Sequence, residues 1–161
     1  MHPKFKTTVL CEGLLACPGS SGIPHKSGTM EREGWLVLRK VAEANWTQTR
    51  ADYATAVTLY DAGVYYASVF FSQQAAEKAL RAVNIRRFQK MPRGHNLIQM
   101  ANALDAPLEI MNAAAELNPE FLASRNPESA DGVPSQIYDS RSARLHLHAA
   151  QLVVEWAKTL I

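Results

Sequence analysis

The sequence has little cysteine, no long hydrophobic run and almost no net charge. Its two cysteines, Cys11 and Cys17, both lie near the N-terminus of the 161 residues. The rest of the chain therefore cannot carry a disulfide framework or a cysteine-based zinc site, which fits the reducing cytoplasm. No apolar run is long enough to span a membrane. With a formal charge of +2, bulk charge by itself does not indicate nucleic-acid binding.

Strand signals are also missing, because no stretch alternates apolar and polar residues for long enough. After Met30 the pattern is helical, with breaks at glycine and proline. We predict an all-α, up-and-down antiparallel bundle of four main helices plus a short one, since short connections make successive helices neighbours. The expected helices span about 31–62, 64–88, 95–104, 105–125 with an interruption at Asn118-Pro119, and 138–160, with residues 126–136 as a loop.

The N-terminal segment differs from the remainder in composition. Residues 18–29 are rich in glycine, serine and proline, which is typical of a disordered stretch. We interpret residues 1–30 as a flexible or mis-started extension and residues 31–161 as one helical domain. The alternative is an export signal, which Glu12 weakens by interrupting the apolar run.

The helix predicted over 64–88 carries an unusual polar stripe. Its apolar and alanine positions cover about half the circumference at 100° per residue, so we expect it to touch more than one neighbour. The polar positions align in one narrow stripe, and Glu77 precedes Arg81 by one turn, which favours an ion pair. One interpretation is a solvated face with a weak salt bridge. The other is a second, mixed interface, either a subunit contact or a site wall, because aromatic residues share the stripe. Its residues are Tyr66, Phe70, Gln73, Gln74, Glu77, Arg81 and Asn84.

The same helix resembles the signature of the HEPN domain family. The stretch GVYYASVFFSQQAAEKALRA has its aromatic residues and its QQA-AEKAL core, and the chain adds a Gly-His-x-Leu start to the next helix. A later turn departs from the family pattern, with Asn126 for Tyr and Glu128 for Asp after Arg125. The resemblance covers roughly residues 44–160. The matching positions are Asp52, Gly63, Tyr65 to Ala67, Phe70 or Phe71, Gln73 to Leu80 (with Lys78), and Gly94 to Leu97 (with His95).

This resemblance implies a helical bundle, usually a homodimer, in a prokaryotic and cytoplasmic protein. It also implies pairing with a minimal nucleotidyltransferase in toxin–antitoxin-like systems. Some members of the family are metal-independent ribonucleases with an Arg-x4-6-His motif near the start of the last helix.

Arg141 and His146 fit that motif here. A ribonuclease needs a proton-transfer group, which histidine supplies, and a cation, which arginine supplies. Positions five apart on a straight helix point about 140° from each other, so the two converge only at a frayed helix start or across a dimer. The alternative for His146, which lies in the apolar arc, is a hydrogen-bonded core or interface histidine. The histidines lack a zinc-site spacing, so we expect neither a metal nor a cofactor.

A basic segment is the strongest nucleic-acid feature. Between residues 78 and 93 there are six basic residues and no acidic one, and Phe88 could stack on a base. The alternative is a solubilising helix end. Our leading prediction is a dimeric, non-catalytic partner module for a nucleotidyltransferase that also binds RNA or a nucleotide, and the competing one is the ribonuclease. The expected ligand-binding residues are Arg125, Arg81, Arg86, Arg87, Lys90 and Arg93.

Overall fold

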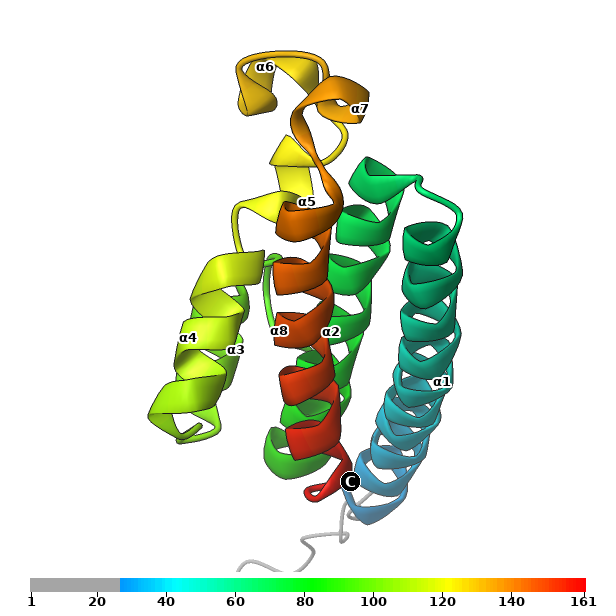
Figure 1. The fold of residues 1–161 in the computed structure, drawn as a ribbon. Coiled ribbons are helices and arrows are strands. Elements are labelled where there is room, and N and C mark those ends of the chain that lie inside the picture. The colour runs from blue at the N-terminus through cyan, green and yellow to red at the C-terminus, as the bar shows by residue number, and fades with distance from the viewer. Residues whose placement is uncertain (1–26) are drawn as a thin grey trace, which may run out of the picture.

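The computed structural model describes residues 27–161, and all of their regular structure is helical. Two long helices, α1 (Ser27–Asp61) and α2 (Tyr65–Phe88), form an antiparallel pair (Figure 1). Gly63 makes the reversal, because its φ of +75° is accessible to glycine at little cost. Its N–H bonds to the Tyr60 carbonyl, and the Val64 N–H bonds to the Leu59 carbonyl. These are the two hydrogen bonds of a Schellman motif, which ends α1.

The second half of the chain contains α3 (Leu97–Ala103), α4 (Leu108–Leu117) and the long α8 (Ser140–Lys158). Three single-turn helices, α5 (Glu120–Ala123), α6 (Pro127–Ala130) and α7 (Pro134–Ile137), lie between α4 and α8. They form a cap at the end of the bundle where α8 begins (Figure 1). Asp139 and Ser142 start α8 with a reciprocal capping box.

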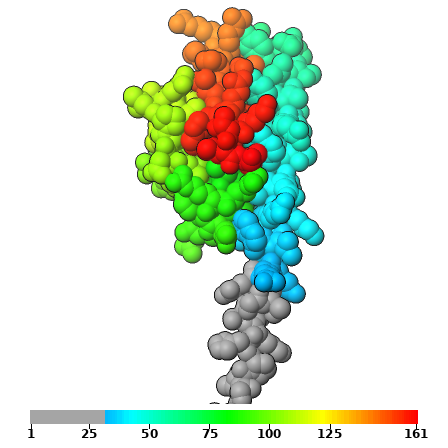
Figure 2. Space-filling view, turned by 90° about the horizontal axis from the view of Figure 1, so that it is seen from below, coloured from blue at the N-terminus to red at the C-terminus, as the bar shows by residue number. Residues whose placement is uncertain are grey.

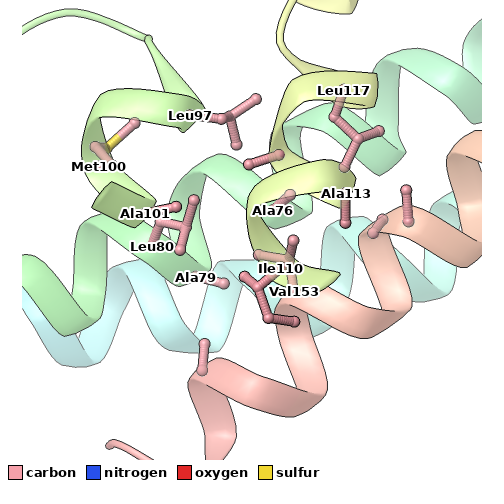
Figure 3. Close-up of a cluster of buried hydrophobic side chains, with 14 of the residues drawn as sticks. Ala76, Ala79, Leu80, Leu97, Met100, Ala101, Ile110, Ala113, Leu117 and Val153 are labelled. Carbon is pink, nitrogen blue, oxygen red and sulfur yellow. The ribbon is translucent and has the colours of Figure 1, made fainter. Parts of the chain in front are cut away.

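The hydrophobic core lies where α2 meets α3, α4 and α8 (Figure 3). Leu80, Leu97 and Leu117 are fully buried there, and Val153 reaches the same cluster from α8. Alanines at 76, 79, 101 and 113 let the helix backbones come close. The helix α2 packs against α1 on one side and α8 on another, and it also contacts α3, α5 and α7. The expectation that α2 has more than one neighbour is confirmed.

The all-α bundle predicted from the sequence is confirmed, with differences in detail. Residues 126–136, expected as a loop, contain α6 and α7, each with proline in its first turn, where the missing N–H costs nothing. The short helix starts at Leu97 rather than His95, because the Asn96 side chain caps it by accepting from the Gln99 N–H at 2.9 Å. The interruption expected at Asn118-Pro119 separates α4 from α5.

The two ends of the described chain lie at the opposite pole from the cap. Seen from that pole, the N-terminal part of α1, the end of α2 and the end of α8 are neighbours (Figure 2). Residues 1–26 of the predicted N-terminal extension lie outside the described residues. No helix within residues 27–161 is long and apolar enough to cross a membrane.

Candidate functional site

The polar stripe on α2 is a buried hydrogen-bond network. Gln73 is fully buried and Glu77 is 5% exposed. The Gln73 side-chain amide donates to Glu77 Oε2 at 3.1 Å, and the Gln74 side-chain amide donates to Gln73 Oε1 at 2.7 Å. The interpretation as a solvated face is therefore wrong for Gln73 and Glu77. The segment between α2 and α3 covers Glu77 and Arg81 of this stripe.

Glu77 ties that covering segment to α2. Its Oε1 lies 2.8 Å from Arg81 Nη2 and 2.8 Å from His95 Nδ1. The Arg81 guanidinium also donates to the carbonyls of Pro92 and Gly94. Burial raises the pKa of Glu77, but the hydrogen bonds from Arg81, His95 and Gln73 outweigh it, so the net pKa is lowered. The carboxylate therefore stays charged in the folded protein.

The other signature residues occupy the sides of this network. Lys78 pairs with the buried Asp52 of α1 at 2.8 Å and also donates to Gln74 at 2.8 Å. This pair joins α1 to α2. Tyr66 is exposed at the start of α2, while Phe70 is half-buried.

A stack of ring and guanidinium planes lies next to the network, between α2 and α5. The His95 ring lies parallel to the Phe121 ring, with centroids 4.1 Å apart. The Arg125 guanidinium carbon lies 4.3 Å from the Phe121 centroid and 5.5 Å from that of Phe70. Arg125 is exposed and forms no ion pair within residues 27–161, so its N–H groups can donate to an anion. A hollow of about 330 Å³, lined by His95, Asn118 and Phe121, lies beside the stack.

The six predicted ligand-binding cations fall into two groups. Arg81 is bound to Glu77 and two carbonyls, and Arg87 donates to the Leu104 carbonyl and to Asp105 at 3.0 Å each. These two arginines therefore have structural partners. The remaining cations are exposed and take part in no ion pair among the described residues: Arg86, Lys90, Arg93 and Arg125.

Lys90 and Arg93 line a groove of about 460 Å³ between α2 and α3. Phe88 forms part of its wall and is 40% exposed. Gln99 adds an amide on the α3 side. Two cations, an aromatic face and an amide are the groups that contact phosphates and unstacked bases.

Arg141 and His146 lie on different sides of α8. Arg141 is exposed in the first turn, whereas His146 is 7% exposed and faces the core. His146 Nδ1 lies 2.7 Å from the Ser142 carbonyl, and Nε2 lies 3.2 Å from Glu120 Oε1 and 3.6 Å from Glu116 Oε1. Within one chain the two motif residues are therefore not brought together. His148 is exposed.

Glu120 and Tyr138 belong to the His146 cluster and were not predicted from the sequence. Tyr138 donates its hydroxyl hydrogen to Glu120 Oε2, and its ring lies edge-on to that of His146. Burial and the Glu120 carboxylate raise the pKa of Tyr138 far above its ordinary value. The only sequence signal was His146 within an apolar arc, which requires a buried partner without saying which one.

The fold and the α2 signature define a class of helical-bundle proteins. The HEPN domain model matches residues 42–160, and the chain belongs to the HEPN domain family. An archaeal HEPN homologue of known structure is 27% identical, with a TM-score of 0.65 over 73% of this chain and 95% of its own. A HEPN domain protein from Thermotoga maritima is 25% identical, with a TM-score of 0.57 over 73% of this chain and 96% of its own.

A third structure, from Thermus thermophilus, shares the fold at 24% identity. Its TM-score is 0.69 over 74% of this chain and 98% of its own. No curated protein gave a significant sequence match.

Proposed function

We propose that this chain is a non-catalytic, homodimeric binding module that pairs with a minimal nucleotidyltransferase and binds RNA or a nucleotide. The exposed groove with Lys90, Arg93 and Phe88 carries the ligand part of the proposal. Arg125 adds an exposed guanidinium beside the His95–Phe121 stack. HEPN membership supports the dimer, the partner and the proposed cytoplasmic location.

Fluorescence anisotropy with a labelled single-stranded RNA and with a labelled nucleotide tests the ligand part. The double substitution Lys90→Ala/Arg93→Ala should weaken binding, and Arg125→Ala should weaken it independently. Each lost phosphate contact should lower the slope of log affinity against log salt by about 0.7. Arg39→Ala is the matched control, because Arg39 is exposed but already pairs with Glu43 on α1. Binding that none of the three basic residues affects would overturn the proposal.

The partner and assembly parts are tested separately. Sedimentation at micromolar concentration should give the mass of a dimer. Co-expression with a minimal nucleotidyltransferase from the same source should give a complex that survives gel filtration. A monomer that never forms this complex would reduce the proposal to its ligand part.

A metal-independent ribonuclease is the second candidate, because His146 is held by a carboxylate. A histidine paired in this way can stay protonated and act as a general acid. RNA cleavage in EDTA, compared between the wild type and the Arg141→Ala and His146→Ala variants, decides the question. Cleavage that both substitutions abolish while the dimer survives would replace the proposed binding role. Equal cleavage by all three proteins would indicate a contaminant.

A further inference from the structure

The short helix α5 is held on the bundle by a carboxylate. Glu120 is the one buried residue of α5, at 7% exposure. Its two oxygens meet His146 Nε2 and the Tyr138 hydroxyl, so α5 is joined both to α8 and to the segment just before α8. No other ion pair among the described residues includes a member of the turn from 119 to 126. Among the described residues, this cluster is therefore the charged attachment of α5 to α8, beside the packing of Phe121 on His95.

The hydrogen bonds of His146 fix its protonation state. The Ser142 carbonyl can only accept, so Nδ1, which is 2.7 Å away, must carry a hydrogen. A neutral imidazole has one N–H, and its Nε2 lone pair would then face the carboxylates of Glu120 and Glu116. Only the doubly protonated ring can donate to Ser142 and Glu120 together. With Glu120 as a carboxylate, the arrangement thus requires the imidazolium form of His146.

The next residue along α5 belongs to the candidate ligand surface. Phe121 follows Glu120 directly, stacks on His95, and supports the Arg125 guanidinium at 4.3 Å. A shift of α5 would move Phe121 and Arg125 together. Because the cluster and the stack hold consecutive residues of one helical turn, the first positions the second.

We propose that Glu120, His146 and Tyr138 form a pH-dependent latch that positions Phe121 and Arg125 for ligand binding. The regulatory part rests on the proposed function, while the latch itself does not. His146 is then a positioning residue. Loss of its proton leaves Glu120 buried against a lone pair, which loosens α5 and displaces Arg125.

The direction of the pH effect follows from the groups that face His146. These are Glu116 from α4, Glu120 from α5, Tyr138 before α8 and the Ser142 carbonyl within α8. Burial lowers the pKa of His146, but the bonds to Glu120 and Ser142 and the charges of Glu120 and Glu116 outweigh it, so the pKa is raised. The latch is therefore fully present below the ordinary histidine pKa of about 6.5 and is lost as pH rises through the raised value.

Hydrogen exchange of the full chain, corrected for intrinsic rates, tests the latch without any ligand. The opening constant of residues 119–126 should rise by up to about tenfold per pH unit in the pH window between the ordinary histidine pKa and the raised pKa of His146, and then level off. An NMR titration of His146 should have its midpoint in the same window, above that of an exposed histidine. The exchange of α2 should not change. Flat exchange in residues 119–126, or a midpoint at or below the ordinary pKa, would overturn the latch.

Substitutions separate the latch from its regulatory role. His146→Gln should remove the pH dependence of exchange, while His148→Gln, a change of the exposed histidine two residues further on, should preserve it. If His146→Gln does not fold, Tyr138→Phe keeps the ion pair and should raise exchange at every pH.

RNA binding should fall with rising pH in the wild type and stay flat in Arg125→Ala. If RNA does not bind but exchange behaves as expected, the latch stands and the proposed function fails. If exchange behaves as expected and RNA binding is independent of pH, the regulatory role fails.

Discussion

Glu77 is the residue that holds the segment between α2 and α3 against α2. Three side chains converge on its carboxylate, and two of them, Arg81 and Gln73, come from its own helix. His95 is the third and comes from the segment itself. Removing the charge leaves a half-buried arginine with only two carbonyl partners, which costs more than losing an exposed ion pair.

Glu77→Gln should therefore lower the free energy of unfolding by roughly 3 kcal/mol. Urea denaturation at fixed protein concentration measures this change. Glu43→Gln is the matched control, because Glu43 pairs with Arg39 one turn away with both side chains exposed. The control should cost less than about 1 kcal/mol. Equal costs for the two variants would show that the Glu77 network adds nothing beyond a surface pair.

The lowered pKa of Glu77 also fixes the sign of a pH effect. Stability from this carboxylate is present above its ordinary pKa and is lost as pH falls through the lowered value. Unfolding measured between neutral pH and acid should thus show a steeper loss for the wild type than for Glu77→Gln. Parallel curves for the two proteins would contradict the assignment.

Residue types were predictable here and their partners were not. The sequence showed that Gln73, Glu77 and Arg81 share a stripe, because helical spacing determines that. It could not show that His95, 18 residues after Glu77, completes the network, since only the path of the connecting segment brings the two together. In the same way, His146 was visibly out of place in an apolar arc, but its partner Glu120 comes from another helix.

At the scale of elements, glycine plays different parts in the segment between α2 and α3 and in the interior of α1. Gly94 has a φ of +69°, and its carbonyl accepts from Arg81. Gly34 lies inside α1, and a Cβ there would meet nothing within 4 Å. The same substitution should therefore have opposite effects at the two sites.

Gly94→Ala should destabilise the protein by about 1 kcal/mol, because an L-residue pays for the left-handed conformation. Gly34→Ala should stabilise it by about 0.5–1 kcal/mol, because alanine loses less backbone freedom in a helix. Thermal unfolding of the two variants beside the wild type measures both changes. A neutral Gly94→Ala would show that the segment between α2 and α3 adopts another backbone conformation in solution.

The cap is the part of the fold that was predicted wrongly from the sequence. A segment with two prolines and one glycine looked like a loop, yet Pro127 and Pro134 each start a helical turn. Proline excludes a helix interior but suits a first turn, so its presence alone does not distinguish a loop from a string of single turns. Packing against α2 and α5 resolves this ambiguity.

At the scale of the whole molecule, stability rests on one apolar cluster shared by four helices. Leu80 is fully buried within this cluster (Figure 3). Leu80→Ala should lower the free energy of unfolding by roughly 2–5 kcal/mol, since it loses buried apolar contacts and leaves a cavity. Leu36→Ala, at a 54% exposed position on α1, is the control and should change it by less than about 0.5 kcal/mol. Denaturant unfolding with unchanged m-values would confirm the comparison.

The sequence by itself determined the helical class, the main helix boundaries and the HEPN family, because helical periodicity, glycine stops and the α2 signature are local properties. Only the tertiary structure decided which charged residues are available to contact a ligand. It placed Arg81 and Arg87 in intramolecular bonds, left Lys90, Arg93 and Arg125 exposed, and enclosed His146 with Glu120 and Tyr138. The physical reason is that a side chain's partners depend on which helices lie next to each other, and residues far apart in the sequence meet only after the chain has folded.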